Sequence, residues 1–243
     1  MAVEVRYPTA AHRRLVDEIL SSLRARPGVG GVLLGGSLAR GTARDDSDVD
    51  ILVVATTDDR PRIPGSLPVD LLVRTEEQWR RCFTPDRVGD ESWGYAFLDG
   101  VVLHDPDGVV ADLVTRARDC HTRYRTPASI TAHYAALWRH VRPKMLAVHR
   151  RGDPVEVGWA AAAMTNDLLR TAWAVNDLPN PSLDLGTVQR HLDDLTIPPG
   201  IADLLRALLR SSPQEGLRAQ LELLGTLEPH LSAPPGGTRS AGN

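Results

Sequence analysis

A glycine-rich turn follows a short apolar run near the start of the chain, and it constrains the local fold more than any other feature. Residues 32–34 are Val-Leu-Leu, a run with β propensity, and Gly35 and Gly36 close it. The sequence from Ser37 onward suits the start of a helix. We therefore expect a strand, a Gly-Gly-Ser turn and a helix, in that order. Such a turn can bind phosphate oxygens. The free N–H groups at the helix N-terminus and the Ser37 hydroxyl can donate hydrogen bonds, and glycines without Cβ atoms let the phosphate approach the backbone.

Two carboxylates stand at the start of the next apolar run. Asp48 and Asp50 are two residues apart at the beginning of the run 49–54, and residues at this spacing in a strand point to the same face. A further run, 68–73, carries Asp70 among apolar neighbours. We expect these three carboxylates to converge. They would repel one another without a cation, whereas Mg²⁺ bound to phosphates prefers oxygen ligands. The pattern therefore predicts a magnesium site.

The motif Gly36-Ser37, ten intervening residues and Asp48-Val-Asp50 resembles the signature of the polymerase-β-type nucleotidyltransferase superfamily. Within that superfamily, the run 35–50 is similar to minimal nucleotidyltransferases and to aminoglycoside (antibiotic) adenylyltransferases. The resemblance extends over about 45 residues if Asp70 is the third acid. A Gly-rich turn followed by a solvated acidic loop is the ordinary alternative, but it does not explain acids inside apolar strands.

The resemblance implies a Mg²⁺-dependent adenylyltransferase that moves AMP from ATP to a hydroxyl of a small molecule, such as an aminoglycoside-like antibiotic, and releases pyrophosphate. In this interpretation Asp48 and Asp50 hold the metal that bridges the phosphates, and Asp70 completes a second site at the acceptor hydroxyl. Gly36 and Ser37 hold the departing phosphates. The alternative is an antitoxin-like minimal nucleotidyltransferase that binds or AMPylates a partner protein. A non-catalytic interaction protein is a third class, and the intact set of acids counts against it.

Composition restricts the partners and the compartment. A net charge of −3 and a pI near 6.2 predict no nucleic-acid partner. Cys82 and Cys120 are the only cysteines, which favours a reducing compartment. The sequence has neither a signal-peptide pattern nor an apolar run of about 18 residues. We therefore expect a cytoplasmic protein without a membrane partner, and a homodimer is left open.

Two domains fit the 243 residues better than one. Residues 1–125 are predicted to form an α/β nucleotidyltransferase domain, a mixed sheet with flanking helices. A boundary is expected where Thr126 would cap a helix that has Pro127 at its first position. The elements expected in the first domain are a helix over 10–26, strands over 29–34, 49–54 and 68–73, a helix capped by Thr75, a strand or hairpin over 95–104, a turn at 105–108 and a helix over 109–120.

Residues 126–231 are predicted to form an all-α helical bundle that binds the acceptor, and residues 232–243 a disordered tail. By analogy with kanamycin- and streptomycin-type adenylyltransferases, the acceptor is expected in the cleft between the two domains. Trp138, Trp159 and Trp173 are expected to pack between helices. The predicted helices span about 127–149, 154–176, 184–194, 200–211 and 213–229.

Basic side chains are candidates for phosphate contact. Of the 28 lysine and arginine residues only Lys144 is a lysine, and a compact ammonium suits a single phosphate oxygen. An ordinary surface lysine is the alternative. Arg44 lies between the serine and the acids and is a second candidate, whereas Arg40 is expected at the surface. Ser47 is expected to brace the loop that presents Asp48.

The general base for the acceptor hydroxyl is left open among Glu156, Asp167, Glu91 and Asp99. Two of them have ordinary explanations. Asp167 is expected to pair with Arg170 one helical turn away, and Glu156 to stabilise a helix N-terminus.

Overall fold

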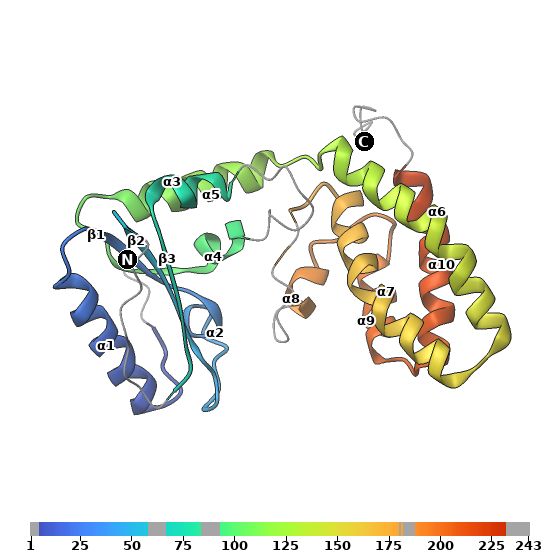
Figure 1. Ribbon diagram of the computed structural model, residues 1–243, viewed down its shortest axis with the longest axis horizontal. Coiled ribbons are helices and arrows are strands. Elements are labelled where there is room, and N and C mark those ends of the chain that lie inside the picture. The colour runs from blue at the N-terminus through green and yellow to red at the C-terminus, as the bar shows by residue number, and fades with distance from the viewer. Residues whose placement is uncertain (1–4, 58–66, 84–92, 180, 182–187, 232–243) are drawn as a thin grey trace. The chain divides into compact units, whose positions relative to one another are not determined.

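The computed structural model describes residues 5–57, 67–83, 93–179, 181 and 188–231 (Figure 1). The chain divides into two compact units, Met1–Arg123 and Tyr124–Asn243. The first unit contains a sheet flanked by helices, and the second is helical. The predicted fold class, an α/β domain followed by an all-α domain, is confirmed.

A four-stranded mixed sheet with the order β3-β2-β1-β4 organises the first unit. The central strands β1 and β2 are antiparallel, β3 runs parallel to β2, and β4 runs antiparallel to β1. Each of the strands predicted over 29–34, 49–54 and 68–73 is present to within one residue. The bounds are β1 Val29–Leu34, β2 Val49–Ala55, β3 Val69–Arg74 and β4 Val101–His104.

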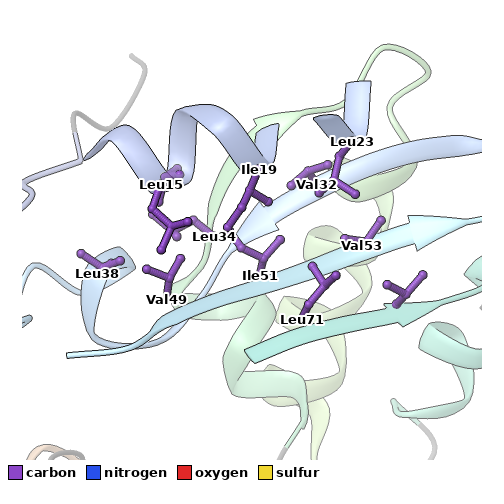
Figure 2. Close-up of a cluster of buried hydrophobic side chains, with 12 residues drawn as sticks. Leu15, Ile19, Leu23, Val32, Leu34, Leu38, Val49, Ile51, Val53 and Leu71 are labelled. Atoms are coloured by element: carbon purple, nitrogen blue, oxygen red, sulfur yellow. The ribbon is translucent and has the colours of Figure 1, made fainter. Parts of the chain in front are cut away.

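Helix α1 (Ala10–Arg24) covers one face of this sheet (Figure 2). Its apolar residues recur at helical spacing, so that Leu15, Ile19 and Leu23 share one buried face. They pack against alternate residues of the central strands, including Ile51 and Val53. Burial of this stripe joins the helix to the sheet, since removing apolar surface from water is the main favourable contribution to folding.

Helices α3 (Glu76–Arg81), α4 (Trp93–Asp99) and α5 (Val109–Arg123) belong to the opposite face. The strand residues of opposite parity point there, and they share an apolar cluster with Trp79 and Phe97. The indole of Trp79 is fully buried and donates a hydrogen bond of 2.9 Å from Nε1 to the backbone oxygen of Val53 in β2. That bond attaches α3 directly to the sheet.

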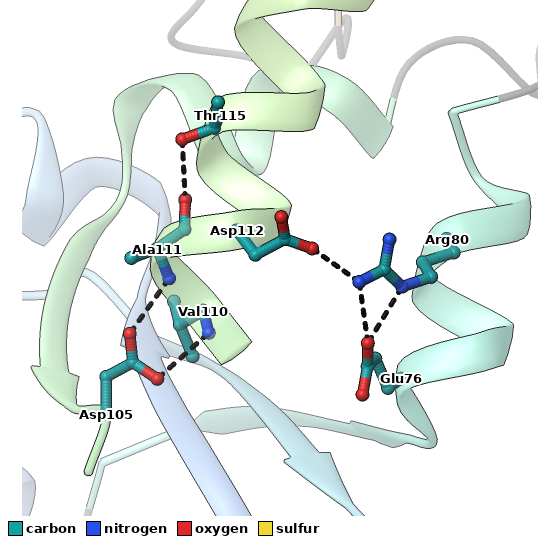
Figure 3. Close-up of polar contacts among 7 residues, drawn as sticks. All are labelled: Glu76, Arg80, Asp105, Val110, Ala111, Asp112 and Thr115. Carbon is teal, nitrogen blue, oxygen red and sulfur yellow. Dashed lines mark hydrogen bonds and ion pairs between the residues drawn. The ribbon is translucent and has the colours of Figure 1, made fainter. Parts of the chain in front are cut away.

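Polar contacts join α3 to α5 and fix the start of α5 (Figure 3). The guanidinium of Arg80 pairs with Glu76 of its own helix at 2.7 Å and with Asp112 of α5. The carboxylate of Asp105 accepts hydrogen bonds of 2.9 Å from two N–H groups in the first turn of α5. Thr75 caps α3 as predicted, in a reciprocal capping box with Gln78.

The strand or hairpin expected over 95–104 is wrong in its first half. Residues up to Asp99 belong to α4, and only Val101–His104 form a strand. Phe97 explains the difference, because its ring is buried edge-on against Trp79 at 5.2 Å and against Phe83 at 5.3 Å. These tertiary contacts favour a helical turn where the local pattern resembles a strand.

The second unit is all-α in its described residues, and α10 packs against both α6 and α7. No described helix of the chain is long and apolar enough to cross a membrane. The expected tail over 232–243 lies outside the described residues. The helices are α6 Ala128–Arg151, α7 Pro154–Val175, α8 Val188–Leu192, α9 Ile201–Arg210 and α10 Pro213–Leu231.

The expected helix cap at Thr126 is wrong. Pro127 occupies the N-cap position of α6, and no side chain caps that helix end. The hydroxyl of Thr126 instead donates 2.8 Å to the backbone oxygen of Ala174, and its N–H donates 3.1 Å to Asp177. Both partners lie at the end of α7, where the carbonyls of the last turn have no partner inside their own helix. Thr126 therefore joins α7 to the segment that precedes α6.

The three tryptophans of the helical unit do not share one environment. Trp138 and Trp173 are buried, with exposures of 1% and 0%, as expected of helix-packing residues. Trp159 is 75% exposed, so its expected packing role is wrong. Trp159 follows the exposed Val155 by one turn, which places both on the outer side of α7.

We predict that Trp138→Phe lowers the free energy of unfolding of the second unit by about 1–3 kcal/mol, whereas Trp159→Phe changes it by less than about 0.5 kcal/mol. The reason is that Trp138 loses a buried 2.8 Å hydrogen bond from Nε1 to the Thr171 hydroxyl. Urea unfolding monitored by circular dichroism would measure both values. Equal effects of the same substitution at the buried and the exposed position would contradict this assignment.

Candidate active site

The carboxylate of Asp50 lies directly against the glycine turn between β1 and β2. The N–H of Gly35 donates 2.9 Å to the backbone oxygen of Asp50, which brings the turn onto the acid. A Cβ atom at Gly36 would lie 1.7 Å from Oδ2 of Asp50, and the backbone there has φ +60°. Position 36 therefore accepts only glycine without displacing the carboxylate.

Ser37, the next residue of the turn, has a buried hydroxyl that no described residue engages. Its backbone oxygen accepts 2.9 Å from the N–H of Thr42, so the turn itself is anchored. A buried hydroxyl that finds no partner within the protein is suited to an external oxygen ligand.

The helix expected after Ser37 is present, but α2 (Gly36–Ala39) is only one turn long. A single turn sums few peptide dipoles, so the expected contribution of a helix macrodipole to phosphate binding is small. Any phosphate affinity of this turn rests on the close backbone at Gly36 and on the Ser37 hydroxyl.

Asp70 stands beside Asp50 across two parallel strands. Their Cα atoms are register partners in β2 and β3, and Leu52 and Leu72, two residues further along, are partners too. Residues in register on parallel strands point to the same face of the sheet. Asp50 is half-buried and Asp70 is exposed, as is Asp48, which precedes β2. The structure thus places the predicted acids at one end of two adjacent strands.

The expected convergence of the three carboxylates on one point is not present. No three Asp, Glu, His or Cys side chains among the described residues form a group that could hold a metal ion. The Asp50 carboxylate lies toward Gly36, as its close approach to that residue requires. Mg²⁺, however, usually binds through one or two carboxylates together with substrate phosphates. The carboxylate oxygens at this end of the sheet are donors of the type that magnesium prefers.

The loop that leads to Asp48 is held by short-range hydrogen bonds. The N–H of Arg44 donates 2.8 Å to the Ser47 hydroxyl, and the N–H of Ser47 donates 3.1 Å to the backbone oxygen of Arg44. Ser47 therefore braces the loop as expected. The side chain of Arg44 is exposed, and that of Arg40 is half-buried.

Sequence reasoning missed His12, which contacts this loop from α1. The residue is fully buried, and its Nε2 lies 2.9 Å from the backbone oxygen of Ser47. One signal was present in the sequence. His12 occupies the same helical stripe as Leu15, Ile19 and Leu23, so a polar ring stands where the spacing predicts an apolar side chain.

Of the other candidates, Lys144 and Glu156 belong to the second unit, whereas Asp99 and Glu91 belong to the first. Lys144 is exposed on α6, with Nζ 2.8 Å from Nε2 of His140. Glu156 lies in the first turn of α7, as expected, and also pairs with Arg151 at 2.6 Å. Asp99 is the last residue of α4, and Glu91 lies outside the described residues.

The expected pair between Asp167 and Arg170 is absent. Asp167 is half-buried on α7, and no ion pair is formed between the two side chains. The Nε atom of Arg170 is buried without a hydrogen-bond partner among the described residues. The ordinary explanation of Asp167 as one half of a helix-surface ion pair is therefore wrong.

Comparison with known proteins gives one family match. Residues 16–85 match the model of the nucleotidyltransferase domain. This segment includes β1, β2 and β3, the turn at Gly36 and all three predicted acids. A search of curated proteins finds no match.

Among solved structures, the crystal structure of a nucleotidyltransferase-like protein from Exiguobacterium sibiricum 255-15 is similar to this chain at 17% sequence identity. The alignment covers 89% of this chain and 74% of that one, with a TM-score of 0.46. The family match coincides with the segment that contains the glycine turn, Ser37 and the acids Asp50 and Asp70, which are register partners. Residues 16–85 therefore form a nucleotidyltransferase domain of the polymerase-β type.

Proposed function

We propose that the protein transfers AMP from ATP to a hydroxyl group of a small molecule, with release of pyrophosphate. A nucleotidyltransferase domain supports nucleotidyl transfer as the reaction. The observation that carries the proposal is the contact between the Asp50 carboxylate and Gly36, beside a buried Ser37 hydroxyl that no described residue engages. These groups would supply an anion-binding turn and, in contact with that turn at Gly36, a cation-binding carboxylate.

Each residue has a separate role in this proposal. Ser37 would donate a hydrogen bond to a β- or γ-phosphate oxygen, and Gly36 would admit the phosphate to the backbone. Asp48, Asp50 and Asp70 would hold Mg²⁺, which when bound neutralises phosphate charge and lowers the pKa of the acceptor hydroxyl. The acceptor oxygen forms a bond to the α-phosphorus while the bond from that phosphorus to the bridging oxygen breaks. Pyrophosphate takes the electron pair.

A base must accept the proton of the acceptor hydroxyl, and of the four candidates Glu156, Asp167, Glu91 and Asp99 we propose to test Asp167 first. Glu156 is engaged by Arg151, whereas Asp167 is half-buried and forms no ion pair with a described residue. A partly desolvated carboxylate without a cationic partner is suited to proton transfer. Asp167→Asn should then lower kcat more than it raises KM for the acceptor.

The product that carries label from ATP shows whether the acceptor is a small molecule or a protein. With [α-³²P]ATP, Mg²⁺, a panel of hydroxylated antibiotics and a cell lysate, we expect a labelled product of low mass. Parallel reactions with GTP, CTP and UTP would establish the base preference. A labelled protein band that persists through denaturing electrophoresis, without any low-mass product, would instead favour the antitoxin-like alternative.

The metal acids give a direct test. We predict that Asp48→Asn and Asp50→Asn each reduce transfer by about 100-fold or more, because each removes a charge that the cation requires. Asp45→Asn is the matched control, since Asp45 is exposed in the same loop and lies outside the proposed site. Initial rates and melting temperatures would be measured together. Parent-like transfer by either variant would contradict the metal assignment, and an active Asp70→Asn would move the third ligand elsewhere.

Alanine substitutions at two glycines of the same segment distinguish the effect of a steric clash from that of backbone strain. Gly36 and Gly41 have φ values of +60° and +69°, but a Cβ atom at Gly41 would meet nothing within 4 Å. Gly41→Ala should therefore cost only the about 1–2 kcal/mol of a left-handed backbone. Gly36→Ala should in addition displace the Asp50 carboxylate and reduce transfer by about 100-fold or more. Equal rates for the two alanine variants would argue against a role for the Gly36–Asp50 contact.

We also propose that Lys144 contacts the triphosphate. Lys144→Ala should raise KM for ATP about tenfold, and Lys144→Arg should restore only part of that loss, because a planar fork replaces a point charge poorly. Arg139→Ala, on the same helix and also exposed, is the control for net charge. An unchanged KM for ATP in Lys144→Ala would show that Lys144 is an ordinary surface residue.

A further inference from the structure

His12 combines complete burial with full use of both ring nitrogens. Its exposure is 0%, at the third position of α1, and a buried imidazole is costly unless its nitrogens are bonded. Nδ1 lies 2.8 Å from the hydroxyl of Thr9, and Nε2 lies 2.9 Å from the backbone oxygen of Ser47. The first contact is local to the helix cap, whereas the second spans 35 residues of sequence.

The partners determine which nitrogen carries the proton. A carbonyl oxygen only accepts, so Nε2 must donate to Ser47. In the neutral ring Nδ1 then accepts from the hydroxyl of Thr9, so that this tautomer satisfies both contacts. The ring therefore connects Thr9 and Ser47 at a fixed separation, with Nε2 as the donor and Nδ1 as the acceptor.

The donor end holds the backbone immediately before a proposed metal ligand. Ser47 precedes Asp48, and the N–H of Val49, on the other side, donates 3.0 Å to the backbone oxygen of Pro68. Asp48 is thus flanked by two backbone groups that are bonded to distant segments. Among the described residues, the other hydrogen bonds of Ser47 go to Arg44 within the same exposed loop, so they cannot fix the loop against the domain.

We propose that His12 is a positioning residue for Asp48. Helix α1 is packed into the core through Leu15 and Ile19. The hydrogen bond from His12 to Ser47 attaches the end of the loop before Asp48 to this fixed helix. This role rests on the proposed function only in that Asp48 acts as a metal ligand. His12 itself touches neither nucleotide nor metal in this scheme.

Two amide variants separate the two bonds of the ring. In His12→Gln the side-chain amide reaches the position of Nε2 and keeps a donor for Ser47, whereas in His12→Asn it reaches only the position of Nδ1 and keeps only the Thr9 contact. Both lose the ring, so the loss of packing is shared. We expect the amides of Ser47 and Val49 to exchange hydrogen about tenfold faster in His12→Asn than in the parent, and within about threefold of the parent in His12→Gln.

Binding and rate measurements connect the loop to the site. With Mn²⁺ and ATP as the probe, followed by electron paramagnetic resonance, His12→Asn should bind Mn²⁺ about tenfold more weakly, and His12→Gln should recover most of the affinity. Where transfer is measurable, His12→Asn should lower kcat more than it raises KM for ATP. Identical exchange and Mn²⁺ affinity in the two variants would overturn the proposal.

A measurement on the unchanged protein covers the case in which both variants fail to fold. The ¹⁵N spectrum of the His12 ring should show a protonated Nε2 and an unprotonated Nδ1. The opposite tautomer would leave the Ser47 carbonyl without a donor and would overturn the proposal. If the parent transferred no nucleotide to any acceptor, the proposed function would fail, while the exchange and tautomer results would still decide the positioning role.

Discussion

The close approach of the Asp50 carboxylate to Gly36 is the contact on which the arrangement of the nucleotidyltransferase domain depends. It requires a missing Cβ atom and a left-handed backbone at one position, and glycine meets both requirements. Because β1 and β2 are antiparallel neighbours, the end of β1 lies beside the beginning of β2. The turn that leaves β1 and the acid that enters β2 therefore meet by topology. Ser37, with its buried hydroxyl, is the next residue of that turn.

The two faces of the sheet have different tasks at this end. Val49 and Ile51 point to the α1 face and contribute to the core, whereas Asp50 lies between them with the opposite parity. One short strand thus anchors itself through its apolar residues and presents an acid on its other side. His12 extends the same division to the preceding loop, since it is buried with α1 but bonds the backbone of Ser47. The positions of Asp48 and Asp50 are therefore fixed by attachment to the packed core.

The helical unit is joined internally by buried polar contacts as well as by apolar packing. Trp138 of α6 donates to the Thr171 hydroxyl of α7, which in turn donates 2.7 Å to the backbone oxygen of Asp167. Gln220 of α10 donates 2.8 Å to the backbone oxygen of Ala161 in α7. Each of these hydrogen bonds satisfies a buried polar group that would otherwise have no partner among its apolar neighbours. The bonds therefore favour one packing of the three helices over alternatives. Asp167 is positioned through its own backbone by this chain of bonds.

Local patterns in the sequence were sufficient for most elements and for the site motif, because period-two and helical spacings, capping residues and a glycine turn are properties of neighbouring residues. They predicted β1, β2, β3 and the helices of the second unit, and they placed Gly36, Ser37, Asp48, Asp50 and Asp70 in one motif. Contacts between distant segments decided the rest. The ring of Phe97 against Trp79 selected a helix over a strand, the hydroxyl of Thr126 bonded α7 instead of capping α6, and Trp159 was left exposed. Likewise, neither the direction of the Asp50 carboxylate nor the bond from His12 to Ser47 is encoded in any spacing, since each depends on which surfaces the folded chain brings together.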